Sequence, residues 1–158
     1  MIAEGAKIIP LLASANYGAG VDMDSFKAQG DSITVILTFG SVTGNAKLKV
    51  YSGATAGAKT SSIPFKYAYG GGSIGAASAD YLSAWGDGSA SSGMTLTGTV
   101  YTSKMAVLNI DVDAMDLANN EEWLTLNIDG SASSGILHAV AVLENPRYSG
   151  NRSTTLLA

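Results

Sequence analysis

Alternation of apolar and polar residues with a period of two is the sequence feature that most constrains the fold of this chain. In residues 31–40 this spacing puts Ile33, Val35, Leu37 and Phe39 on one face. Such a pattern is typical of a β-strand with one buried face, whereas an amphipathic helix repeats every 3.6 residues. The chain is therefore predicted to fold mainly from strands.

Seven segments have strand character, and turn-forming residues separate them. They are residues 31–40, 45–53, 61–72, 94–102, 105–113, 122–129 and 136–144. Short strands with turns between them are typical of a sandwich or barrel. We expect an all-β fold, an antiparallel β-sandwich, made by a single domain over residues 1–158.

The pattern also predicts how some of these segments pair. The first two segments should form one hairpin, and residues 94–113 should form another around Ser103 and Lys104. Pro64 lacks an amide hydrogen, which predicts either an edge strand for residues 61–72 or a place for Pro64 among the first residues of a strand. Residues 136–144 are apolar on both faces, as expected of a central strand buried between layers.

The two ends of the chain differ from its middle. Residues 1–20 and 145–158 are polar or irregular. Terminal segments of this kind fray unless something holds them, and they gain order by lying on a partner. We therefore predict flexible terminal arms at both ends, with Arg147, Tyr148 and Arg152 as contacts, because Arg and Tyr are favoured at interfaces.

Composition excludes several classes of function. The chain has a net charge of −4 and no basic cluster, which argues against nucleic-acid binding. It has no cysteine and one histidine, His138, which stands among apolar residues and is expected to be a strand residue. No segment approaches the length of a membrane span. Only 14% of the residues are charged, which suits a protein packed in an assembly and equally a secreted or small-residue-rich domain.

A calcium loop is suggested by the acidic residues after position 110. Counting from Asp111, Asp113 falls at position 3 and Glu122 at position 12, as in an EF-hand. Met115 and Asp116, however, occupy the positions that need an oxygen ligand and a glycine. We therefore expect no metal site and no cofactor, but a connection in which Asp116 or Asn119 caps a helical turn. The sequence leaves open whether Asp111, Asp113 and Asp116 bind a cation.

No arrangement of catalytic residues is predicted. The chain lacks a nucleophile-elbow motif, and a serine triad would require His138 to meet a serine and an acid by chance. A carbohydrate-binding adhesin module is an alternative, because exposed aromatic rings can stack on sugars. The candidate rings are Tyr67, Tyr69, Tyr81, Trp85, Tyr101 and Trp123, although burial is the commoner fate of such residues.

Several stretches resemble small virion structural proteins of tailed bacteriophages. The segment LHAVAVLENPRYSGN at 137–151 resembles their closing strand and Pro-Arg-Tyr element. Residues 33–57, 65–88 and 107–129 are similar to further parts of these proteins, so the resemblance spans roughly residues 30 to 150. Asn145 before Pro146 and a longer N-terminal segment depart from that pattern, which leaves the mode of anchoring open.

The resemblance implies a jelly-roll-like sandwich without catalytic activity. It implies a capsid decoration (cement) protein on the capsid surface of a virion, with the major capsid protein as partner and a homo-oligomer, dimer or trimer, as the bound form. A tail or head-to-tail connector protein is the alternative within the same class. No nucleic acid or membrane partner is implied.

Overall fold

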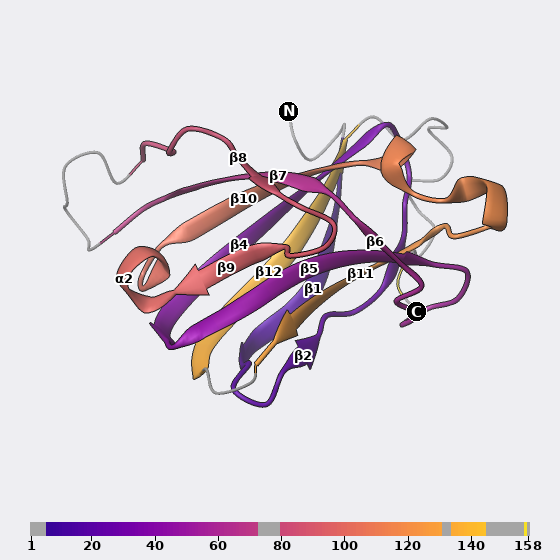
Figure 1. The fold of residues 1–158 in the computed structure, drawn as a ribbon. Helices are drawn as coiled ribbons and strands as arrows, with labels where there is room; N and C mark the ends of the chain where they lie inside the picture. The colour runs from indigo at the N-terminus through magenta and orange to yellow at the C-terminus, as the bar shows by residue number, and fades with distance from the viewer. Residues whose placement is uncertain (1–5, 73–79, 131–133, 145–156, 158) are drawn as a thin grey trace.

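The structure is a computed structural model that describes residues 6–72, 80–130, 134–144 and 157, and it consists of two antiparallel β-sheets packed face to face (Figure 1). The prediction of an all-β sandwich is confirmed. We name the sheets by their central strands. The β4 sheet contains, in order, β1 (Ala6–Asn16), β12 (Ser134–Glu144), β4 (Ser32–Thr43), β10 (Met105–Asp111), β7 (Phe65–Gly70) and β8 (Gly86–Gly88).

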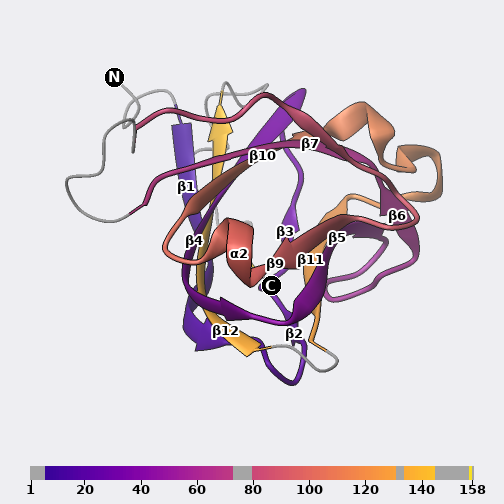
Figure 2. The same cartoon turned by 60° about the vertical axis from the view of Figure 1, so that its left-hand side comes forward.

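The β5 sheet forms the second layer. Its strands are β2 (Val21–Asp22), β11 (Trp123–Asp129), β5 (Asn45–Gly53) and β6 (Ser61–Ile63), with β3 (Phe26–Lys27) paired to β11 and β9 (Met94–Thr97) paired to β5. The described helical segments are short: α2 (Gly98–Tyr101) and the 3-10 turns η1 (Val112–Ala114) and η2 (Leu117–Asn119). Figure 2 shows α2 at one end of the sandwich. None of the described helices is long and apolar enough to cross a membrane.

Both sheets contribute their inward residues to one hydrophobic core. In β4 the four alternate apolar residues that the sequence placed on one face are all buried. The facing strand β11 buries Leu124, Leu126 and Ile128 completely. Burial of such a side chain stabilises a fold by about 1.5–3 kcal/mol. The sandwich is therefore held together mainly by contact between the two inner faces.

The predicted hairpin of residues 31–53 is wrong. Strand β4 pairs with β10 and β12, whereas β5 pairs with β11, β6 and β9. The chain turns at Gly44, which has a φ of 71°, and passes from one sheet into the other. Both strands bury one apolar face, and they do so from opposite sides of the core. Alternation shows which face of a strand is buried but not which strand lies beside it.

The hairpin predicted for residues 94–113 is also wrong, for the same reason. Strand β9 belongs to the β5 sheet and β10 to the β4 sheet, with α2 between them. The chain also crosses between the sheets at Pro64, which separates β6 from β7. Consequently the 61–72 segment is an edge strand only in its first part, because β7 lies between β10 and β8.

The prediction of a flexible N-terminal arm over residues 1–20 is corrected, because Ala6–Asn16 forms strand β1. This strand pairs with β12 from Ala6 to Asn16, with irregular register between Pro10 and Ala15. The sequence did not predict this strand because Pro10 and several small residues weaken the alternating pattern. The structure accepts Pro10 because an edge strand tolerates a residue without an amide hydrogen. The C-terminal arm, residues 145–158, lies outside the described residues except for Leu157, which bridges Phe26 and packs against the core.

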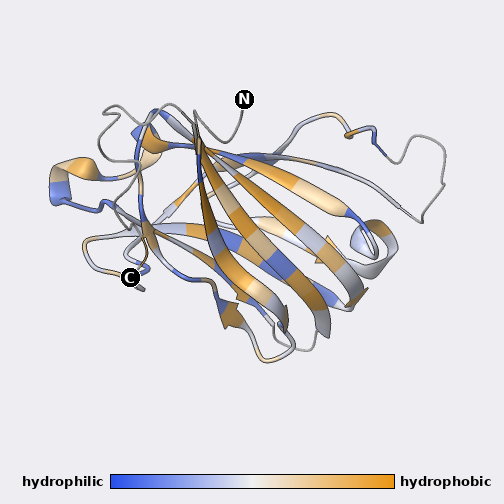
Figure 3. Cartoon of the chain, turned by 180° about the vertical axis from the view of Figure 1, so that it is seen from behind, coloured by the Kyte–Doolittle hydropathy of each residue, from blue (hydrophilic) through white to orange (hydrophobic). Residues whose placement is uncertain are grey.

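Strand β12 is not buried between layers, which corrects a further expectation. Its inward residues Leu137, Ala139, Ala141 and Leu143 are completely buried. On the other face, His138 is exposed, and Val140 and Val142 are only half-buried. The β4 sheet thus covers the core with one face, and no second layer of strands lies over the other face of β12 in the described part of the chain. Figure 3 shows this sheet from behind, with apolar residues along its strands.

Adjacent residues of β10 provide a direct test of this arrangement. Leu108 is completely buried, whereas its neighbour Val107 is half-buried on the opposite face. Leu108→Ala should lower the free energy of unfolding by about 2–5 kcal/mol, because it leaves a cavity in the core. Val107→Ala should cost only about 1 kcal/mol or less, because it removes little buried area. Chemical denaturation of both variants measures the difference, and equal large losses would show that a further layer covers the outer face.

Candidate functional site on the outer face of the β4 sheet

The outward residues of the β4 sheet form cross-strand rows. One row consists of Pro10, Val140, Ile36 and Val107, on β1, β12, β4 and β10. The next row consists of Ile8, Val142, Thr34, Asn109, Lys66 and Asp87 and crosses all six strands. A third contains His138, Thr38 and Met105. We call these residues the outer face; they come from segments far apart in the sequence.

The part of the outer face between β1 and β10 is apolar and carries no charged residue. Ile8 has 59% of its surface exposed and Met105 has 36%, and three valines and Ile36 between them are half-buried. The polar residues in this part of the rows are Thr34, Thr38, Asn109 and His138. We call this part the apolar half. Removing such a surface from water is favourable because it is apolar. No ionised group has to lose its hydration, so no desolvation cost opposes this burial.

A groove lies where the outer face reaches β7 and β8. It has a volume of about 370 Å³ and is lined by Pro64, Phe65, Lys66, Asp87, Gly88, Ser89, Asn109, Asp111 and Ala114. A neighbouring hollow of about 340 Å³ is lined by Lys66, Trp85 and Asn109. The two hollows share Lys66 and Asn109, so Trp85 stands beside the same polar side chains that line the groove.

The polar side chains of the groove are weakly engaged within the protein. Lys66 Nζ lies 3.6 Å from Asp87 Oδ1, and both side chains are mostly exposed, so this ion pair contributes little to stability. Asp111 Oδ1 accepts a hydrogen bond from the backbone N–H of Asp113. The carboxamide of Asn109 makes no hydrogen bond to any described residue. These groups remain available to a ligand.

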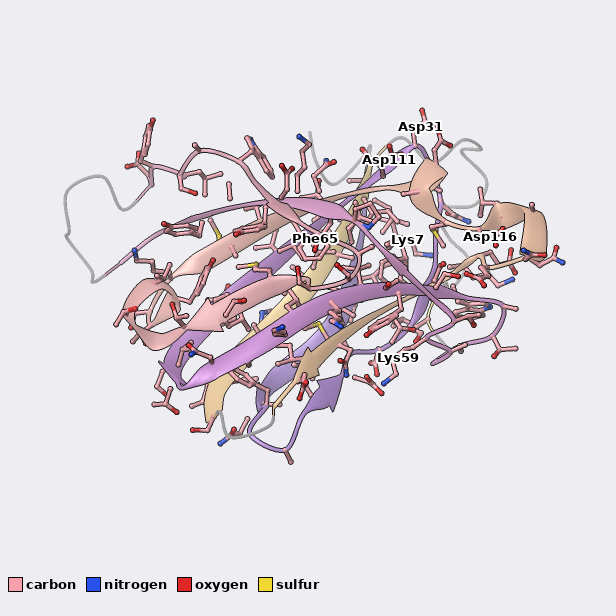
Figure 4. All side chains as sticks on the ribbon, in the orientation of Figure 1. Lys7, Asp31, Lys59, Phe65, Asp111 and Asp116 are labelled. Carbon is pink, nitrogen blue, oxygen red and sulfur yellow. The ribbon has the colours of Figure 1, made fainter. Side chains whose placement is uncertain are left out.

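The wall of the groove depends on a close approach of Gly88 to Phe65. A Cβ atom on Gly88 would lie 2.4 Å from Cζ of the Phe65 ring. Phe65 is only 4% exposed, so its ring has little room to move. Figure 4 shows Phe65 within the sandwich and Asp111 at the rim of the molecule. The groove is therefore anchored on the hydrophobic core.

The aromatic residues considered as a sugar platform do not form one surface. Tyr101 is buried and contacts Tyr69 edge-on, with ring centroids 5.3 Å apart. Burial, then the nearby Tyr67 and Tyr69, raise the pKa of Tyr101 well above its usual range. The half-buried ring of Trp123 lies under Lys27 Nζ at 5.3 Å. Only two of the candidates are largely exposed, Tyr81 at 74% and Trp85 at 53%.

Acidic side chains in the connection after β10 cap the two 3-10 turns η1 and η2. Asp111 caps η1, and Asp116 Oδ1 accepts from the backbone N–H of Asn119, as expected of a helical turn in this segment. Glu122, at the twelfth position of the calcium pattern, pairs with Lys27. Within the described parts of the chain, no three His, Cys, Asp or Glu residues are grouped so as to hold a metal ion.

A buried carboxylate elsewhere in the sandwich has a structural explanation. Glu121 is 4% exposed and accepts hydrogen bonds from Ser52 Oγ at 2.7 Å and from Ser61 Oγ at 3.3 Å. Buried ionisable groups often mark functional sites. Here both carboxylate oxygens are occupied by hydroxyls of the neighbouring strands β5 and β6. Glu121 therefore connects the segment just before β11 to these strands.

The predicted partner contacts Arg147, Tyr148 and Arg152 lie outside the described residues. His138 is exposed on the outer face, as a strand residue. The sequence analysis did not identify the outer face itself. Its signal was present in the apolar residues on both faces of 136–144, and in Ile36 and Val107 at the outward positions of two further strands.

Comparisons with known proteins identify no family. No family model matches the chain, and no curated protein matches it. One solved structure, that of the infectious bursal disease virus Gt strain, has 10% sequence identity and a TM-score of 0.22. The match covers 97% of this chain and 44% of that one. A similarity at this level supports no conclusion about fold or function.

Substitution of Gly88 tests the wall of the groove. Gly88→Ala should lower the free energy of unfolding by about 1–3 kcal/mol, because the new methyl group displaces the Phe65 ring in a packed region. Ser91→Ala, at an exposed site three residues away, is the control and should change stability by less than about 0.5 kcal/mol. Thermal unfolding measures both. A Gly88→Ala variant as stable as the control would mean that Phe65 does not lie against Gly88.

Proposed function

We propose that this protein is a virion structural protein of a tailed bacteriophage, and that it decorates the outer surface of the head shell. The observation that carries this proposal is the charge-free apolar half of the outer face, over which no other strand or helix of the described residues lies. A partner surface that covers it buries apolar area without desolvating an ion pair. The proposed role is mechanical and involves no catalytic step.

The size of the apolar half indicates how much of an interface it supplies. Four strands about 4.8 Å apart and three rows about 6.8 Å apart span roughly 400 Å². A specific interface usually buries about 800 Å² on each partner. The apolar half would then provide the hydrophobic centre, and residues around it the polar rim. Arg147, Tyr148 and Arg152 are our candidates for part of that rim.

Two features of the sequence support the same proposal. The resemblance to small phage virion proteins covers most of the sandwich, and few residues are charged, at 14%. The major capsid protein is the proposed partner, and a dimer or trimer on the capsid is the proposed bound form. Repetition over a closed shell lets a modest affinity per copy produce a large total stabilisation. A tail or connector protein, present in few copies, is the alternative.

Introducing a charge into the apolar half tests this proposal. Val140→Lys should weaken binding to purified head shells at least about tenfold, because the ammonium group would be buried without a partner. The side chain is half-buried on an open face, so the monomer should still fold. Co-sedimentation of the variant with shells measures the binding, and thermal unfolding checks the fold.

Ser62→Lys is the matched control. It adds the same charge to an exposed position of β6, on the other sheet. Its binding to shells should equal that of the unmodified protein. If Val140→Lys bound as well as this control, the outer face would not be the attachment surface.

A further inference from the structure

The groove and Trp85 differ chemically from the apolar half, although both belong to the same side of the β4 sheet. We propose that this groove binds a saccharide, with the Trp85 indole stacking on a sugar ring. Lys66, Asn109 and Asp87 would form hydrogen bonds to its hydroxyl groups. This inference does not depend on attachment to a shell, because the apolar half shares only Asn109 with the residues that line the two hollows.

The first argument is the exposure of Trp85. Its side chain is 53% exposed, at a position next to strand β8 and the shared hollow. A tryptophan contributes a large apolar area when it is covered, and its flat ring can cover the C–H face of a pyranose. The other tryptophan, Trp123, is half-buried in the β5 sheet and already has Lys27 over its ring.

The second argument is the set of hydrogen-bonding groups. A sugar hydroxyl both donates and accepts, so it needs donors and acceptors close together. Lysine supplies only donors, a carboxylate only acceptors, and a carboxamide both. Lys66, Asp87 and Asn109 occupy one cross-strand row. Their positions on adjacent strands therefore offer a donor, an acceptor and a carboxamide to the same ligand.

Charge and volume favour a sugar over other small ligands. One lysine faces two carboxylates, Asp87 and Asp111, so the groove does not suit a phosphate or another anion. No third carboxylate or imidazole joins them among the described residues, so a metal ion is also disfavoured. Ligand sites typically have volumes of about 300–1,000 Å³. The two adjoining hollows, of about 370 and 340 Å³, together suit one or two sugar units.

The experiment has two stages and uses the full chain. A glycan array of neutral and hexosamine-containing oligosaccharides identifies the oligosaccharide that the protein binds most tightly. That oligosaccharide is then titrated into a Trp123→Phe variant, in which Trp85 is the single remaining tryptophan. The fluorescence of Trp85 should change saturably with sugar concentration, because the ring becomes covered.

Matched variants decide whether this groove is the site. Trp85→Ala should weaken binding at least about tenfold, and Lys66→Met about threefold or more, through loss of stacking and of a hydrogen-bond donor. Tyr81→Ala removes an aromatic residue that is 74% exposed but does not line either hollow, and it should bind normally. Failure of the unmodified protein to bind any glycan would overturn the proposal. So would normal binding by Trp85→Ala.

Discussion

Contact between the inner faces of the two sheets is the interaction on which the rest of this structure depends. Each long strand commits one set of alternate residues to the core, as Ile33, Val35, Leu37 and Phe39 do in β4. The register of the β4 sheet then fixes which residues point outward together. The apolar half and the row of Lys66, Asp87 and Asn109 in the groove are both consequences of that register, since these residues lie at outward positions of strands whose inward positions hold the fold together.

Alternation in the sequence predicted the strands well and their neighbours poorly. Residues 45–53 were predicted as a strand and form β5 with the same bounds. The two predicted hairpins failed because the chain changes sheets at Gly44 and through α2. A strand that follows a crossing to the other sheet buries one apolar face, as does a strand that follows a hairpin turn within the same sheet. Periodicity alone cannot distinguish these two paths.

The candidate site was predictable only in part. Trp85 was a candidate for sugar stacking from the start, but Lys66, Asp87 and Asn109 are brought into one row by pairing between distant strands. The apolar residues of 136–144 were interpreted as burial on both sides. Such a pattern is the same whether the outward side meets another layer of the chain or another molecule. Only the structure shows that this layer is absent from the described part of the chain.

Attachment in many copies to a head shell is the central claim, and copy number tests it most directly. Quantitative mass spectrometry of purified particles from the source of this protein gives its amount relative to the most abundant shell protein. Our account predicts about one copy per shell subunit, or one per few subunits, as repeated contacts on a symmetric shell require. A handful of copies per particle, or absence from particles, would contradict it.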